Sequence, residues 1–103
     1  MSKHKEQLEL FIQNLQSENF YDAHEDLEVL WYERRFEESD EVKLIKGFIN
    51  ASVSFELRKK GKIEASQKVW NNYLRYKDLI NKIDSQHVEK YHQIIKVIDK
   101  INS

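Results

Sequence analysis

The sequence contains no cysteine and no proline, and it has two glycines. The absence of cysteine excludes a disulfide framework, thiol catalysis and a zinc site built on cysteine ligands, and it fits an intracellular protein. Without proline, and with so little glycine, the chain has few of the residues that form the tight turns of a β fold. The composition therefore favours an all-α fold, with helices joined by short polar turns.

Long apolar runs are also missing. No segment approaches the roughly 20 apolar residues of a membrane span, and the first residues, MSKHKEQLELF, lack the apolar region of a secretory signal. We therefore expect a soluble, cytoplasmic protein with no membrane partner. A net charge of −1 argues against a nucleic-acid partner, because phosphate neutralisation needs a surplus of lysine and arginine.

The length and apolar pattern predict a single helical domain over residues 1–103. A chain of 103 residues, 40% hydrophobic and 34% charged, can bury one core but is too short for two. The apolar period predicts about five helices: Lys3 to Gln16, Asn19 to Phe36, Ser39 or Asp40 to Lys60, Ile63 to Ile83, and about 85–102 from a start at Asp84 or Ser85. Short connections make successive helices antiparallel neighbours, so we expect an up-and-down bundle.

The second predicted helix has two apolar stripes instead of one. The first stripe holds Phe20, Ala23, Leu27, Leu30 and Trp31, and the second holds Tyr21, Val29, Tyr32 and Phe36. A surface helix normally has one such stripe, so two predict a central helix with neighbours on both sides. Between the stripes lie His24, Glu28 and Arg35, with Glu25 at the edge, and we expect these side chains to be partly buried.

Two residues of the third predicted helix are unusual for their positions. Glu56 lies in a wide apolar arc, and a buried carboxylate needs a partner. The candidates are His24, Arg34 and Arg35. Of these, His24 and Arg34 border the apolar stripe of the second helix that should pack against the third. Gly47 lies inside the helix, where glycine costs about 1 kcal/mol relative to alanine. Its presence predicts close approach of another backbone or of a ring, for which Trp31 is a candidate.

The stretch YDAHEDLEVLW, residues 21–31, is open to functional and structural interpretations. His24 and Glu28 share one helical face at a metal-chelating spacing, and His87 is the histidine that could approach as a further ligand. His24 or Glu56 could instead carry protons in acid–base catalysis, or Trp31, Tyr21 and Tyr32 could line a ligand pocket. The structural interpretation is a polar network of His24, Glu28 and Glu56 that sets helix register beside a core Trp31.

Three segments resemble the domain-of-unknown-function 309 family: FYDAHEDLEVLW at 20–31, IKGFINASVSF at 45–55 and KKGKIEAS at 59–66. The resemblance covers about residues 8–80. It matches the family pattern at Ala23, His24, Glu25, Glu28, Trp31, Gly47, Ile49, Gly61 and Ala65. Asn50, Leu57 and Lys62 depart from the pattern, and the family's frequent histidine at position 57 is missing. The resemblance implies a small all-α bundle and implies no activity.

These observations favour a non-enzymatic helical module without a cofactor, acting through a protein partner or as a homo-oligomer. In that hypothesis the cluster His24, Glu25, Glu28, Trp31, Arg35 and Glu56 is chiefly structural. The alternative is a small-ligand or metal-binding protein, with hydrolytic activity as one form, that uses His24, Glu25 and Glu28. Self-association requires an apolar patch outside the core, which we expect on the fourth or fifth helix.

Overall fold

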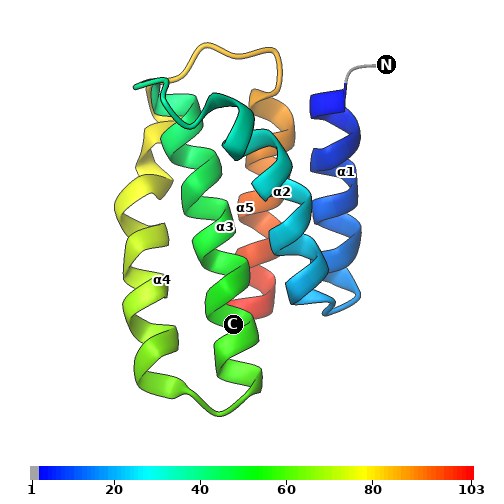
Figure 1. Ribbon diagram of the computed structural model, residues 1–103, viewed down its shortest axis with the longest axis vertical. Coiled ribbons are helices and arrows are strands. Elements are labelled where there is room, and N and C mark those ends of the chain that lie inside the picture. The colour runs from blue at the N-terminus through cyan, green and yellow to red at the C-terminus, as the bar shows by residue number, and fades with distance from the viewer. Residues whose placement is uncertain (1–2) are drawn as a thin grey trace.

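The computed structural model describes residues 3–103. Its elements are α1 (Lys3–Gln16), α2 (Phe20–Arg34), α3 (Asp40–Lys59), α4 (Ile63–Lys77), the 3-10 helix η1 (Asp78–Asn81) and α5 (Val88–Asn102). Figure 1 shows α1 to α4 running alternately down and up, and a loop over the top that leads into α5. The described residues form no strand, so the predicted all-α fold is confirmed. Within this part of the chain, no helix has both the length and the apolar character of a membrane span.

The ends of α3 follow the sequence signals closely. The Ser39 hydroxyl caps the helix by accepting a hydrogen bond from the backbone N–H of Val42 at 3.2 Å. At the other end, Gly61 has a φ of +80°, a left-handed conformation that favours glycine. The cap residue and the terminating glycine therefore both lie where the sequence predicts them.

Other helix ends differ from the prediction by several residues. Asn19 precedes α2 as expected, but its side chain makes no capping hydrogen bond. The fourth helix changes to 3-10 geometry after Lys77, well before Ile83. The fifth begins at Val88, because Ser85 forms a turn in which its hydroxyl accepts a hydrogen bond from the His87 N–H at 3.1 Å. Such boundary shifts arise because local turn contacts compete with helical hydrogen bonds.

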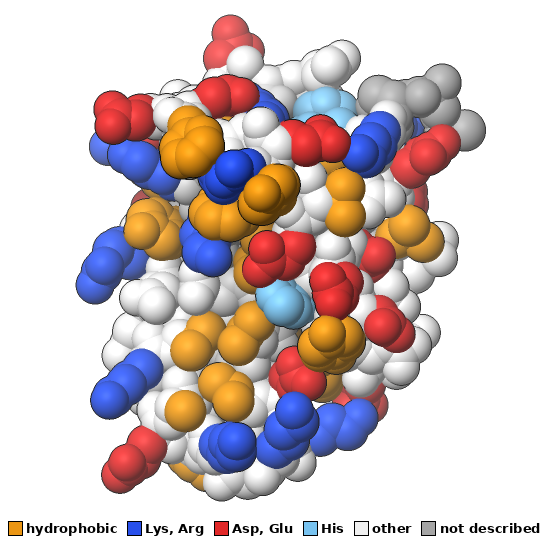
Figure 2. Space-filling model, viewed as in Figure 1, with side chains coloured by type: hydrophobic (Ala, Val, Ile, Leu, Met, Phe, Trp, Pro, Cys, Tyr) orange, Lys and Arg blue, Asp and Glu red, His pale blue; other side chains and the backbone are white. Residues whose placement is uncertain are grey.

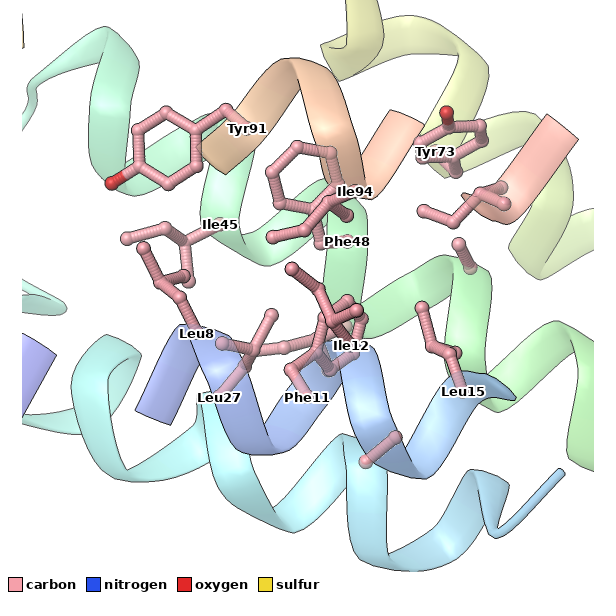
Figure 3. Packing of buried hydrophobic residues seen from close by; sticks show 14 of the residues in the cluster. Leu8, Phe11, Ile12, Leu15, Leu27, Ile45, Phe48, Tyr73, Tyr91 and Ile94 are labelled. Atoms are coloured by element: carbon pink, nitrogen blue, oxygen red, sulfur yellow. The ribbon is translucent and has the colours of Figure 1, made fainter. Parts of the chain in front are cut away.

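The core joins side chains from all five α-helices. In Figure 3, apolar residues of α1 face those of α3 and α5, with Leu27 of α2 and Tyr73 of α4 completing the cluster. More residues are buried on α3 than on any other helix. The helix with the most buried residues is therefore the third, which packs against both α2 and α4.

The expectation that neighbouring helices cover both apolar stripes of the second helix is wrong. α2 packs against α1 and α3 through its first stripe, in which Phe20, Ala23, Leu27 and Leu30 are buried. The second stripe is exposed: Tyr21 by 57%, Val29 by 39%, Tyr32 by 58% and Phe36 by 85%. Periodicity alone could not distinguish an exposed apolar stripe from a covered one.

Gly47 is buried, and the expected close approach is present. The approaching side chain is Tyr76 of α4, however, not Trp31. Gly47 therefore marks the crossing of α3 with α4, which sequence reasoning assigned to α2.

Candidate functional site

His24 and Glu28 lie one turn apart on α2 and contact each other. Nε2 of His24 is 2.9 Å from Oε1 of Glu28, and the two side chains are 24% and 33% exposed. The other ring nitrogen of His24, Nδ1, is buried and has no hydrogen-bond partner among the described residues. In this arrangement one nitrogen is engaged by Glu28 and the other is closed off from solvent, so His24 offers no accessible lone pair to a ligand.

The metal interpretation of this pair lacks further ligands. Between residues 3 and 103, no group of three or more histidine, cysteine, aspartate or glutamate side chains is arranged to hold a metal ion. The suggested approach of His87 is wrong, because its ring stacks on His4 with the centroids 3.9 Å apart. His24 and Glu28 are thus a two-residue contact with no third ligand in the described part of the chain.

Glu56 is paired within its own helix. Its carboxylate lies 3.2 Å from Nζ of Lys60, one turn further along α3, and its side chain is 21% exposed. The expectation of a partner was right, but the candidates His24, Arg34 and Arg35 were wrong. A lysine at i+4 reaches the carboxylate along the same helix face, so no contact between helices is needed.

Arg35 and Trp31 each take part in a contact between a cation and an aromatic ring. The Arg35 guanidinium carbon lies 3.7 Å from the ring centroid of Tyr32 and 4.5 Å from that of Phe36, and Nη1 donates to the Tyr32 carbonyl at 2.5 Å. Trp31 is only partly buried, and Nζ of Lys46 lies 4.4 Å from its centroid. Such contacts contribute about 0.5–1 kcal/mol at exposed sites and fix the orientation of the rings.

Glu25 is exposed, so the expectation that it is partly buried is wrong, and it raises the pKa of Tyr21, one turn before it. The hydrogen bond to Glu25, and then its negative charge, raise the pKa of the Tyr21 phenol. Tyr21 therefore stays protonated at neutral pH and donates to the carboxylate. The sequence-derived cluster is thus split: Glu25 faces solvent, His24 and Glu28 lie at the edge of the buried surface, and Glu56 has a separate partner.

The sequence was also compared with known proteins. The model of a family described as Domain of unknown function (DUF309) matches residues 8–69, more than half of the 103-residue chain. The chain belongs to this family. The match runs from α1 into α4 and ends before residue 80, where the resemblance was expected to end. No curated protein and no solved structure gave a significant match.

This DUF309 chain has a second polar cluster, centred on Glu41 of α3, that sequence reasoning missed. One carboxylate oxygen accepts hydrogen bonds from Tyr91 at 2.6 Å and from Ser85 at 2.7 Å, and the other accepts from Arg34 at 3.1 Å. Because the single Tyr91 proton goes to Glu41, the His4 ring must donate from Nε2 to the Tyr91 oxygen, 2.9 Å away. His4, Ser85 and Tyr91 lie outside the family match, so this cluster ties both ends of the chain to the family domain.

Burial and hydrogen bonding have opposite effects on the pKa of Glu41. Burial alone would raise the pKa of its carboxyl, but hydrogen bonds from Tyr91, Ser85 and Arg34 lower the pKa overall. Burial, followed by the hydrogen bond to Glu41, raises the pKa of Tyr91. Glu41 is therefore an ionised, fully partnered group at the junction of four helices. Its partners come from distant parts of the chain, so no spacing in the sequence could reveal it.

The exposed stripe of α2 is the second feature that sequence reasoning misjudged. Figure 2 shows apolar side chains on the α2 side of the molecule, interleaved with acidic and basic ones. We define the outer face of α2 by six residues: Tyr21, Glu25, Val29, Tyr32, Arg35 and Phe36. The other exposed large apolar side chains, Leu10 on α1 and Ile63 and Leu74 on α4, lie on other helices. The sequence analysis expected an apolar patch on the fourth or fifth helix, whereas α2 and the turn after it carry four exposed large apolar side chains and α4 carries two.

Proposed function

We propose that this DUF309 protein is a non-enzymatic helical module that self-associates through the outer face of α2. The observation that carries this proposal is the exposure of Tyr21, Val29 and Tyr32 along one side of α2, together with Phe36 in the turn just after its end. Single exposed apolar residues are common on soluble proteins, whereas several large ones gathered on one side of the molecule mark an interaction surface. Covering the stripe would remove several large side chains from water, which favours association.

A second copy of this chain is the partner that the charges of the outer face favour. Glu25 lies in the first half of α2, and Arg35 directly follows its end. A surface that carries one charge of each sign at opposite ends is complementary to a reversed copy of itself, whereas a surface of one sign would repel its copy.

The contacts of His24, Glu28 and Glu56 support a structural role for these residues. Each carboxylate has a cationic or hydrogen-bonding neighbour on its own helix, His24 for Glu28 and Lys60 for Glu56. His24 Nδ1 is sealed from solvent, which disfavours proton transfer to a bound substrate. In this proposal the three residues partner their polar atoms within α2 and α3 and take no part in catalysis.

Sedimentation equilibrium over a range of concentrations tests the proposal. We expect the wild type to populate a dimer and Val29→Glu to be monomeric, because the variant places a charge in the middle of the stripe. Leu74→Glu is the matched control, since Leu74 of α4 is exposed by 46%, close to the 39% of Val29. Circular dichroism should show the same helix content for all three proteins. A wild type that stays monomeric up to its solubility limit would overturn the proposal.

A further inference from the structure

We infer that two copies pair with their α2 helices antiparallel, about a two-fold axis that passes beside Val29. This inference rests on the proposed self-association and specifies how the partner is placed. It follows from three properties of the outer face: the spacing of its apolar residues, the position of the Arg35 guanidinium, and the contact between His24 and Glu28.

The apolar and acidic positions of the outer face, which extends past the end of α2 to Phe36, are arranged symmetrically in the sequence about the point between Glu28 and Val29. Tyr21 and Phe36 lie equally far from the point between Glu28 and Val29, and so do Glu25 and Tyr32. When a second helix runs in the opposite direction about that point, Tyr21 of one copy lies opposite Phe36 of the other. Glu25 then lies opposite Tyr32 of the other copy, and the two Val29 side chains meet near the axis.

The position of the Arg35 charge favours antiparallel pairing of the two α2 helices. Its guanidinium is folded back over the ring of Tyr32, 3.7 Å from the centroid, so the positive charge is at the level of Tyr32 along the helix. In the antiparallel pair this level faces Glu25 of the second copy, which is exposed. The two-fold axis repeats the pair, giving two Glu25–Arg35 contacts. Parallel pairing would instead bring Glu25 near Glu25 and Arg35 near Arg35, and both contacts are repulsive.

The contact between His24 and Glu28 removes an obstacle to the pairing. Glu28 lies beside the proposed axis, so the two copies bring their Glu28 carboxylates toward each other. Each carboxylate is held 2.9 Å from Nε2 of His24 on its own helix. A donated hydrogen bond offsets part of the negative charge and restricts the side chain, which weakens the like-charge repulsion.

Engineered cysteines distinguish the two directions, because the chain has no cysteine of its own. We expect Val29→Cys to form a disulfide-linked dimer with itself under mild oxidation. A mixture of Tyr21→Cys and Phe36→Cys should give the mixed dimer, and each of these two variants alone should stay largely unlinked. If Tyr21→Cys links to itself and the mixture gives little mixed dimer, the pairing is parallel and the inference is overturned while self-association stands. A monomeric wild type would overturn both.

A charge exchange measured by sedimentation tests the Glu25–Arg35 contacts. We expect Glu25→Arg and Arg35→Glu each to raise the dimer dissociation constant about tenfold or more, because each variant places like charges opposite each other. The double variant should return the constant to within about threefold of wild type. Glu38→Arg, an exposed change off the outer face, is the control and should have little effect. A double variant that is as weak as the single variants would overturn the inference.

Discussion

Gly47 of α3 lies directly against Tyr76 of α4. A β-carbon built on Gly47 would lie 2.9 Å from the β-carbon of Tyr76, closer than two such atoms pack in proteins. The tyrosine β-carbon is bonded to the backbone and cannot rotate away, so only a shift of one helix could make room. The glycine is thus required by the crossing of α3 and α4.

Replacing Gly47 with alanine should therefore destabilise the protein. Alanine favours the helix by about 1 kcal/mol, but overpacking a tight contact costs about 1–3 kcal/mol. We expect a net loss of up to roughly 2 kcal/mol in the free energy of unfolding, measured by urea denaturation. Lys43→Ala, an exposed change on the same helix, should alter the free energy little. A Gly47→Ala protein more stable than wild type would contradict the packing of α3 on α4.

The α3–α4 contact also contains a reciprocal pair of buried serines. The Ser54 hydroxyl donates to the Ser66 carbonyl, the Ser66 hydroxyl donates to the Ser54 carbonyl, and both distances are 2.9 Å. Each serine-to-alanine change should cost about 1 kcal/mol of unfolding free energy. The hydroxyl oxygens are also 2.9 Å apart, so the double variant should lose less than the sum of the single variants. Strictly additive losses would show that the two serines act independently.

His24→Leu tests whether the His24–Glu28 contact is a binding site. The change removes the buried, unpartnered Nδ1, and Glu28, with its side chain 33% exposed, can be hydrated instead. We expect the melting temperature to stay the same or rise, and divalent cations to cause no shift in either protein. A cation-dependent rise in the wild type that His24→Leu abolishes would instead make this contact a ligand site.

Acidification should destabilise the protein through His4. Burial and the adjacent His87 lower the pKa of His4 from 6.5 to about 4. Between these values the unfolded chain binds a proton that the folded protein excludes, so stability is complete above about pH 6.5 and falls as the pH drops toward 4. The lowered pKa of Glu41 causes a further loss at lower pH, once its carboxylate is protonated.

Melting temperatures measured from pH 7 to pH 5 isolate the contribution of His4, because few carboxylates titrate there. The wild type should lose stability across this range, and His4→Gln should flatten the dependence by removing the titrating ring. His92→Gln, a change at an exposed histidine, is the control and should leave the slope unchanged. An unchanged slope in His4→Gln would show that another group senses the pH.

Much of the helical architecture could be predicted from local chemistry. A cap at Ser39 and a left-handed glycine at Gly61 define the ends of α3, because both depend on the backbone within one turn. Helix ends that depend on turn contacts, such as the start of α5, were misplaced by a few residues. The family was also accessible from the sequence, because the motif around His24 is a local pattern.

The candidate site was only partly predictable. The partly buried positions of His24 and Glu28 follow from helical spacing, but the partner of Glu56 was missed because a lysine on the same helix face was available. The cluster around Glu41 had no signal in the sequence. The other side chains of its hydrogen-bond network belong to residues 4, 34, 85 and 91, and no regular spacing in the sequence relates these positions.

The sequence by itself determined the helices and the amphipathic pattern of α2, because helix formation and side-chain direction depend on neighbours within a few residues. Only the tertiary structure decided which stripe is covered, which side chain approaches Gly47, and where the charges of Glu41 and Glu56 are balanced. Those outcomes depend on the distances between helices, which arise from packing the whole core at once. The exposed outer face of α2, on which the proposed function rests, is therefore a property of the fold.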